Sequence, residues 1–332
     1  MATLYLTEQN TTLHKEQNRL VVKYQDTVLA SIHEFKVERV VVVGNAQLTT
    51  QVMSFLLDHG IDTVFLSIHG KLKGRLAPLE SKNVLLRLAQ FERFRSPDFA
   101  IGLAREVVMA KIANSARVLS RYQRNHSETK FSEALTALEL MLRQAGRTGS
   151  LDALRGVEGQ AAAVYFQVFG GMLRNGLTFD KRTRRPPKDP VNAILSFGYT
   201  LLYQEAISAT ASVGFDPYVG FFHGVDYGRC SLALDLIEEF RAMTIDRLTT
   251  NVFNLGVLSP KDFVKSEEGG VLLDSPGRKR FLGEYERLMT TEFTNPSNGQ
   301  HTCFRKALHE QALALQRAVL QNQKYTPFQE WH

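Results

Sequence analysis

Cysteine is scarce in this sequence of 332 residues, which holds only Cys230 and Cys303. Two cysteines are too few for a disulfide framework or a cysteine-rich zinc site. No apolar run approaches the roughly 18 residues that a membrane-spanning helix needs, so no membrane contact is expected. The first ten residues, MATLYLTEQN, lack the charged start and the long apolar stretch of a signal peptide. Together these absences favour a protein of the reducing cytoplasm.

Several common enzyme motifs are missing as well. The sequence contains no Walker phosphate-binding loop, no GxSxG turn and no CxxC pair. Its formal net charge of +6 permits nucleic-acid binding without establishing it, because the clustering of basic residues matters more than their total. A chain of this length with 44% hydrophobic residues can bury a sizeable core, and two domains are expected.

The first 78 residues have the pattern of a β-rich domain, in which short β-branched or alternating runs are divided by polar turns. The expected strands are Leu4–Thr7, Arg19–Tyr24, Thr27–His33, Arg39–Val43 and Asp62–Ile68. Thr50–His59 is expected to be a helix, because its apolar residues fall on one side. His69–Leu76, with glycines around basic residues, is typical of a hairpin tip or of a solvated turn.

Beyond Pro78 the pattern becomes helical, and a domain boundary is placed near Pro78–Lys82. The fold class is therefore predicted as α+β, with a small β-rich domain over residues 1–78 and a larger all-α domain over residues 79–332. Aromatic residues of the tail, 325–332, are expected to dock on the body. The expected helices are Asn83–Arg95, 96–124, Phe131–Ala145, Leu151–Asn175, Val191–Ala211, Lys261–Lys265, Pro276–Met289 and His301–Gln321, with Gly270–Asp274 extended.

The most informative stretch is Phe221–Arg241, in which a histidine precedes a helix that carries several acids. Asp235 and Glu238 are three residues apart and project from one face of that helix. Carboxylates on an otherwise apolar helix are costly to bury unless they are paired or hold a cation. Together with His223 they suit a divalent ion such as Mn²⁺ or Mg²⁺. The alternative is a buried histidine beside a solvated acidic face.

A second acid lies on the expected helix Leu151–Asn175. Glu158 and Tyr165 share one stripe of this helix, and the surface near Glu158 is made of glycine and alanine. Such a bare surface lets another helix or a ligand approach the carboxylate closely. The alternative is a packed, hydrogen-bonded glutamate with a purely structural role.

The densest basic stretch is Phe179–Pro190, where five cations occur within eight residues. Two prolines stiffen this loop, and such a basic loop suits a phosphate backbone or, alternatively, is merely solvated. Asp189 and Pro190 then cap the expected helix Val191–Ala211, which carries Asn192 and Ser196. The candidate DNA-binding residues are Lys181, Arg182, Arg184, Arg185 and Lys188, and the supporting candidates are Tyr165, Asn192 and Ser196.

Three stretches together resemble one known family, the larger of the two universal CRISPR spacer-acquisition proteins. They are LRGVEGQAAAVYF at 154–166, RRPPKDPVNAILSFGY at 184–199 and GFFHGVDYGRCSLALDLIEEFR at 220–241. Their order is the family's order, and a β domain before a helical domain is also similar to the family. The resemblance implies a metal-dependent DNA endonuclease and integrase that inserts short DNA segments into a CRISPR repeat array by 3′-hydroxyl attack on a phosphodiester.

The resemblance also implies particular roles for the candidate residues. Glu158, His223 and Glu238 would bind Mn²⁺ or Mg²⁺, and Asp235 would be a nearby catalytic acid. Many relatives carry aspartate where this chain has Glu238. The partners implied are a homodimer, double-stranded DNA as short duplex and repeat, and a small companion spacer-acquisition protein. Two alternatives stay open: a non-catalytic DNA scaffold with a structural Glu–His–Glu cluster, and a metal hydrolase of small phosphorylated molecules.

Overall fold

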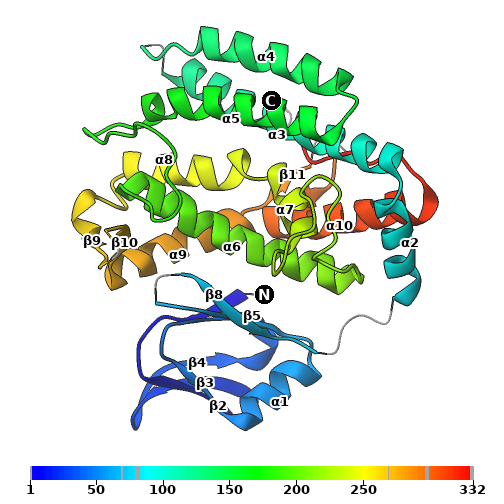
Figure 1. Ribbon diagram of the computed structural model, residues 1–332. Coiled ribbons are helices and arrows are strands. Elements are labelled where there is room, and N and C mark those ends of the chain that lie inside the picture. Colours follow the sequence, from blue (N-terminus) through cyan, green and yellow to red (C-terminus); the bar gives the residue numbers. More distant parts are fainter. Residues whose placement is uncertain are drawn as a thin grey trace. The chain divides into compact units, whose positions relative to one another are not determined.

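A computed structural model of the protein describes residues 2–68, 70–78, 83–126, 128–267, 269–295 and 299–329. The chain divides into two compact units, residues 1–80 and 81–332 (Figure 1). Most of the expected boundary, residues 79–82, lies outside the described residues. A strand-rich first unit and a helical second unit confirm the predicted α+β class.

The first unit contains two four-stranded sheets. Parallel pairing joins β1, β5 and β7 in the first sheet, and β8 is added antiparallel to β7. In the second sheet β3 pairs antiparallel with both β2 and β4, and β6 adds to β2 in parallel. The strands are β1 (Ala2–Leu6), β2 (Thr11–Glu16), β3 (Arg19–Tyr24), β4 (Thr27–His33), β5 (Val37–Val43), β6 (Gln47–Leu48), β7 (Asp62–Leu66) and β8 (Leu72–Leu76).

The core of this unit lies between its sheets and the helix α1 (Thr50–Asp58). Leu13, Leu20, Val40 and Leu56 are fully buried there. The side chain of Thr49 caps α1 by accepting a hydrogen bond from the backbone N–H of Val52 at 3.4 Å.

Two expectations for this unit need correction. Strand β2 was not expected, because its sequence TTLHKE contains little besides polar residues, although Leu13 faces the core. The expected hairpin tip His69–Leu76 is mostly strand β8, which returns along β7. His69 itself lies outside the described residues. The glycine and the basic residues of β8 hide the alternation of apolar and polar residues that is typical of a strand. The sequence therefore has the pattern of a turn.

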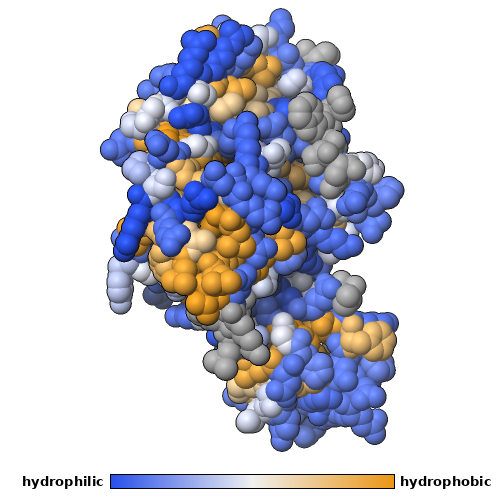
Figure 2. All heavy atoms as spheres, turned by 90° about the vertical axis from the view of Figure 1, so that its right-hand side faces the viewer, coloured by the Kyte–Doolittle hydropathy of each residue, from blue (hydrophilic) through white to orange (hydrophobic). Residues whose placement is uncertain are grey.

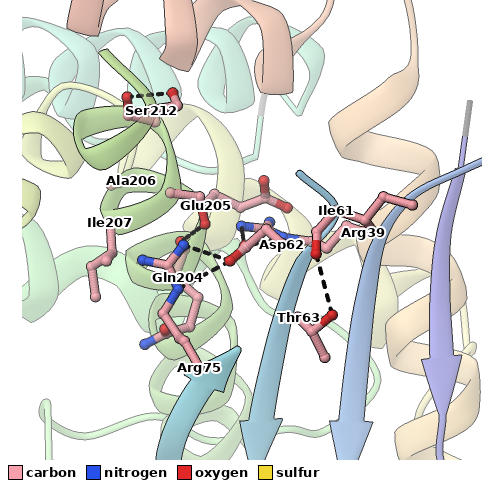
Figure 3. A network of polar contacts seen from close by, with 12 residues as sticks. Arg39, Ile61, Asp62, Thr63, Arg75, Gln204, Glu205, Ala206, Ile207 and Ser212 are labelled. Atoms are coloured by element: carbon pink, nitrogen blue, oxygen red, sulfur yellow. Dashed lines mark hydrogen bonds and ion pairs between the residues drawn. The ribbon is translucent and has the colours of Figure 1, made fainter. Parts of the chain in front are cut away.

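An ion-pair cluster ties the strands β5, β7 and β8 together (Figure 3). Arg39 on β5 and Arg75 on β8 flank Asp62 at the start of β7. Arg39 Nη2 lies 2.9 Å from Asp62 Oδ2, and Arg75 Nη2 lies 2.5 Å from Asp62 Oδ1. Each guanidinium also donates from its Nε to the same oxygen, so Asp62 Oδ2 accepts two hydrogen bonds from Arg39 and Oδ1 accepts two from Arg75.

The second unit is built mainly of helices. The helices are α2 (Val84–Phe94), α3 (Pro97–Asn125), α4 (Ser132–Arg147), α5 (Leu151–Phe169), α6 (Pro190–Val213), α7 (Ser231–Glu238), α8 (Arg247–Asn254), α9 (Ser275–Thr290) and α10 (Phe304–Gln321). A π-helix, Ala242–Asp246, joins α7 to α8. Two short antiparallel pairs, β9 (Phe263–Lys265) with β10 (Val271–Leu273) and β11 (Phe293–Thr294) with β12 (His301–Thr302), are added to the helices. The segment Lys261–Lys265 is therefore a 3₁₀ turn and a strand, not the expected helix.

Helix α6 packs against α7 and α10, while α3, α4 and α5 lie side by side as a further layer (Figure 1). The cap predicted for α6 is confirmed, since Asp189 Oδ1 accepts from the backbone N–H of Asn192 at 2.8 Å and Pro190 is the first helical residue. The expected tail docking is confirmed for Tyr325 and Phe328, which are buried. Residues 330–332 of the tail lie outside the described residues.

One helix exposes an apolar face. On the side of the second unit shown in Figure 2, apolar side chains gather over α2. Leu86 of this helix is buried, while Leu85 and Leu88 on the other side are 75% and 55% exposed. None of the helices in the described ranges is long and apolar enough to cross a membrane.

Candidate metal centre

The histidine segment before α7 is held by a single buried carboxylate. Asp235 accepts hydrogen bonds from the backbone N–H groups of Phe221, Phe222 and His223 at 2.6, 3.0 and 2.8 Å. Only 2% of Asp235 is exposed. Gly220 makes this turn possible, because a Cβ atom there would lie 2.7 Å from the backbone of Ser231 and 2.9 Å from the Asp235 carboxylate. Asp235 thus fixes both the path of the segment and the place of its histidine.

The same carboxylate also sets the proton position on the histidine. His223 Nδ1 lies 2.7 Å from Asp235 Oδ1, so Nδ1 donates and Nε2 keeps its lone pair when the ring is neutral. His223 Nε2 lies 3.8 Å from Glu238 Oε1. A histidine whose other ring nitrogen donates to a carboxylate is the usual arrangement of a metal ligand.

Three elements bring the predicted ligands together. Lys111 of α3 lies between Glu158 on α5 and Glu238 on α7, and His223, in the segment before α7, lies beside Glu238. Lys111 Nζ is 2.6 Å from Glu238 Oε2 and is also in contact with Glu158 Oε1. Arg241 Nε lies 3.1 Å from Glu238 Oε1.

The electrostatics of this place favour an ionised Glu238. Burial by itself would raise the pKa of this carboxyl, since only 3% of it is exposed. The charges of Arg241, Lys111 and His223 outweigh burial and lower the pKa of Glu238 to about 2. Its carboxylate is therefore available to a cation over the whole physiological pH range.

These residues have the chemistry to hold a divalent ion. Two carboxylates and one neutral imidazole nitrogen are oxygen and nitrogen donors that suit Mn²⁺ or Mg²⁺. Glu238 Oε2 is buried, and its nearest cation within the described residues is the Lys111 ammonium at 2.6 Å. In the described part of the chain no three His, Cys, Asp or Glu side chains stand grouped as ligands. Here the Lys111 ammonium separates the two glutamates.

A small cavity of about 40 Å³ adjoins Glu158 and Lys111. Tyr165 and Tyr199 form part of its wall, and both are near Asp246 in the π-helix. The Tyr199 hydroxyl donates to Asp246, and the guanidinium of Arg241 lies 4.7 Å above the Tyr199 ring. Burial raises the pKa of Asp246 to about 6, although the two tyrosines and the nearby arginines pull it down. This network fixes Arg241, which in turn contacts Glu238.

Four basic side chains of the loop Phe179–Pro190 are exposed to solvent, and a fifth points into the helical unit. Lys181, Arg184, Arg185 and Lys188 are exposed. Arg182 instead points into the unit, where it donates to Asn192 Oδ1 at 2.7 Å and to Ser196 Oγ at 3.0 Å. The position of Arg182 therefore suits a supporting role better than direct contact with DNA.

Asn192 anchors this loop from α6. It is fully buried, its Oδ1 accepts from the backbone N–H of Thr183 at 2.9 Å, and its Nδ2 donates to the carbonyl of Lys181 at 2.8 Å. Two of the predicted supporting residues, Asn192 and Ser196, thus shape the loop, and the third, Tyr165, lines the cavity. Arg184 also lines that cavity, which connects the loop to the site of Glu158.

Sequence reasoning missed Lys111, Arg241 and Asp246. Lys111 stands alone among apolar residues in the run VVMAKIA of α3, and a lone cation in such a run was the available signal. Arg241 and Asp246 follow the acidic helix within eight residues of Glu238. Their roles depend on the π-helix, which local sequence patterns do not reveal.

Comparisons with known proteins identify the family of this chain. Residues 4–287 match the family model described as "CRISPR associated protein Cas1". The "CRISPR-associated endonuclease Cas1 3" of Thermus thermophilus is 35% identical over 328 residues, which are 98% of this chain and 96% of that protein. A "CRISPR-associated exonuclease Cas4/endonuclease Cas1 fusion" of Geobacter sulfurreducens is 37% identical over 322 residues, 95% of this chain. The chain spans 57% of the length of that fusion protein.

Solved structures share the fold. The structure titled "Casposase bound to integration product" superposes with a TM-score of 0.86 at 23% identity, over 99% of this chain and 94% of that one. A chain of the "Cas6-RT-Cas1--Cas2 complex" gives a TM-score of 0.82 at 26% identity, over 99% of this chain and 36% of that one. The family model and the near full-length identity to the Thermus protein establish the relationship: this chain belongs to the CRISPR-associated Cas1 family.

Proposed function

We propose that this protein is a metal-dependent DNA endonuclease and strand-transfer integrase, which joins the 3′ ends of a short duplex to CRISPR repeat DNA. One observation carries the proposal. Glu158 and Glu238 already share a cation, the ammonium of Lys111, and His223 Nε2 lies 3.8 Å from the other carboxylate oxygen of Glu238. The named endonucleases among its relatives, at 35% identity, support the reaction class.

The residues have separate tasks in this reaction. Strand transfer needs no protein nucleophile, since the DNA supplies its own 3′-hydroxyl. A bound Mn²⁺ or Mg²⁺ would lower the pKa of that hydroxyl and neutralise phosphate charge. Glu158, His223 and Glu238 would hold the ion, and Asp235 orients the ring of His223 by accepting the hydrogen bond of His223 Nδ1. Asp235 is therefore a positioning residue in this scheme rather than a direct ligand.

The basic loop binds the DNA backbone. Arg184, Arg185 and Lys188 are exposed and contact phosphates, with Lys181 beside them. Lys188 Nζ donates to the carbonyl of Gly269 at 3.2 Å, which steadies the tip of the loop. Arg184 links this track to the reacting site, because it lines the same cavity as Glu158.

The protein works as a homodimer with a small companion. The edge strand β4 of the first unit exposes apolar side chains, with Val28 and Leu29 at 53% and 47%. Pairing of this edge with a second copy would cover both the side chains and the open backbone groups. The solved complex that names Cas2 supports a companion of that class for this chain. Cys230 and Cys303 are both free and buried, which suits a cytoplasmic site of action.

An integration assay tests the proposal. A labelled short duplex and a repeat-bearing plasmid are incubated with the protein and its companion, in Mn²⁺ or in EDTA. Products should form only with the metal, and Glu158→Ala and His223→Ala should abolish them while DNA binding persists. Glu139→Ala, which removes an exposed acid of α4, is the matched control and should retain full activity.

Two outcomes reject the proposal in favour of another function. Full strand transfer by purified Glu158→Ala, or transfer in EDTA, removes the metal site from the reaction. No transfer by the wild-type protein, with DNA binding that is indifferent to EDTA, identifies a non-catalytic DNA scaffold. Hydrolysis of small phosphorylated molecules that does not depend on Arg184, Arg185 and Lys188 would instead identify a small-molecule hydrolase.

A further inference from the structure

Lys111 occupies the centre of the candidate metal site. Its Nζ lies 2.6 Å from Glu238 Oε2 and contacts Glu158 Oε1, while its side chain is only 18% exposed. The backbone of α3 is fixed nearby, because the buried Asn114 donates to the carbonyl of Glu239 on the α7 side at 2.7 Å. The ammonium is therefore held at the two carboxylates by the packing of α3 against α7, and not by the chance position of a surface side chain.

A divalent ion would need the same oxygen atoms. Carboxylate oxygens lie roughly 2.0–2.2 Å from Mg²⁺ or similar ions, closer than Lys111 Nζ now lies to Glu238. An ammonium group cannot remain between Glu158 and Glu238 once both carboxylates hold such an ion. Two cations at one site also repel each other strongly where water is largely excluded. Binding of the ion thus requires that Lys111 move away.

DNA offers the displaced ammonium a new partner. Lys111 lines the same cavity as Arg184 of the basic loop. A phosphate bound along that loop would bring negative charge to this cavity. Lysine acts as a flexible point charge that binds phosphates readily, and its four-carbon stem can turn without movement of the helix.

We propose that Lys111 is a built-in competitor of the divalent ion, and that a DNA phosphate relieves this competition by drawing the ammonium off Glu158 and Glu238. The inference rests on the proposed metal-dependent function. It makes ion binding and DNA binding mutually reinforcing, because each ligand favours the position of Lys111 that the other requires. The ion would then be held tightly only where DNA is present to react.

Two changes in ion affinity are expected. Lys111→Met keeps an unbranched side chain that is one atom shorter and removes its charge, so without DNA the variant should bind Mn²⁺ about 10-fold more tightly than the wild type. Couplings of this kind typically lie between about 5-fold and 150-fold. DNA should tighten Mn²⁺ binding to the wild type by about 10-fold, and most of that gain should vanish in Lys111→Met.

Mn²⁺ titrations followed by electron paramagnetic resonance of the free ion measure both effects. The DNA is a short duplex with 3′-dideoxy ends, so no strand transfer occurs during the titration. Ion binding by the DNA itself is subtracted with Glu158→Ala at the same DNA concentration. Lys130→Met removes an exposed lysine of the same unit and is the charge-matched control, expected to behave as wild type. Lys111→Gln is measured in parallel in case the methionine variant does not fold.

The outcomes distinguish failure of the Lys111 competition from failure of the proposed metal-dependent function. An Mn²⁺ affinity that is unchanged or weaker in the folded Lys111 variants overturns the competition, while the metal site stands as long as Glu158→Ala loses ion binding. Equal tightening by DNA in the wild type and in Lys111→Met overturns the proposed role of the phosphate. Wild-type protein that binds no more Mn²⁺ than Glu158→Ala refutes the metal site itself, and the inference with it.

Discussion

Asp235 and Glu238 lie three residues apart on one helix, yet replacing each by its amide is expected to affect strand transfer differently. Asp235→Asn swaps one carboxylate oxygen for an NH₂ group that cannot accept hydrogen bonds. If the amide oxygen takes the Oδ1 position beside His223, the NH₂ group faces the backbone N–H groups of Phe221 and Phe222, both of which now bond to Oδ2. Two hydrogen bonds are lost, and the two backbone N–H groups then face an NH₂ group that is itself a donor.

The size of this effect follows from the type of bond. A hydrogen bond to a charged group contributes about 1.5–3 kcal/mol, so loss of two predicts a fall of roughly 3–6 kcal/mol in the free energy of unfolding, less any local relaxation. The weakened hold on His223 should lower Mn²⁺ affinity about 10–100-fold, as is usual for a residue that orients a ligand. Strand transfer should then be reduced and measurable at high Mn²⁺. Glu238→Gln removes a ligand itself and should eliminate transfer at every Mn²⁺ concentration.

The assay is strand transfer as a function of Mn²⁺ concentration, with urea unfolding of each variant as the measure of stability. Asp235→Asn should shift the Mn²⁺ dependence to higher concentration and lower the urea midpoint. Glu238→Gln should leave no concentration at which product forms. The reasoning is refuted by the reverse order, in which Asp235→Asn is inactive at all Mn²⁺ concentrations and Glu238→Gln responds to added metal. Asp235 would then be the ligand and Glu238 the supporting residue.

Three further predictions concern the rest of the chain. Burial raises the pKa of Glu239 from 4.5 to about 7, so between these pH values the folded protein holds a proton that the unfolded chain has lost. The free energy of unfolding should therefore fall by up to about 3 kcal/mol as pH rises from about 4.5 through 7. Urea unfolding of Glu239→Gln at pH 5 and 8 should lack this fall, and an unchanged pH dependence in the variant would contradict the assignment. Replacing Arg184, Arg185 and Lys188 with alanine should weaken binding to unrelated DNA sequences equally and flatten the plot of log affinity against log salt by up to about 0.9 per lost phosphate contact. Arg182→Ala should lower stability instead, because its hydrogen bonds to Asn192 and Ser196 are internal, and an unchanged salt slope in the triple variant would mean that the loop faces only solvent. Light scattering at micromolar concentration should find a dimer that Leu29→Asp dissociates, and a monomeric wild type would refute the edge-strand contact.

Local sequence signals predicted much of the helical unit. Caps such as Asp189-Pro190, apolar spacing and breaks at glycine act over a few residues, so the ends of α3 and α6 fall close to where they were expected. The residues proposed as ligands were also readable, since each lies in a motif with an unusual local composition. Strand β2 was missed because its partners, rather than its own polar sequence, determine its conformation.

The missing parts of the site depend on contacts between distant segments. Lys111 contacts Glu158 and Glu238 only because α3, α5 and α7 pack together. The α3 sequence alone does not predict which acids lie next to Lys111. Likewise, the inward course of Arg182 is set by Asn192 and Ser196 on the following helix. Its place in a basic loop predicts that Arg182 is a surface cation, whereas its neighbours in space make Arg182 part of the interior.

The three acids at positions 235, 238 and 239 show why position in the fold, and not residue type, decides their roles. Asp235 accepts backbone and imidazole N–H groups and so shapes the histidine segment. Glu238 has Arg241 and Lys111 as neighbours, which keep it charged and ready for an ion. Burial raises the pKa of Glu239, because its neighbours Tyr325, Phe328 and Gln311 are neutral donors that offset burial only in part. Glu239 anchors the C-terminal tail instead. The adjacent residues Glu238 and Glu239 therefore have opposite pKa shifts, because charged neighbours surround the first and neutral donors the second.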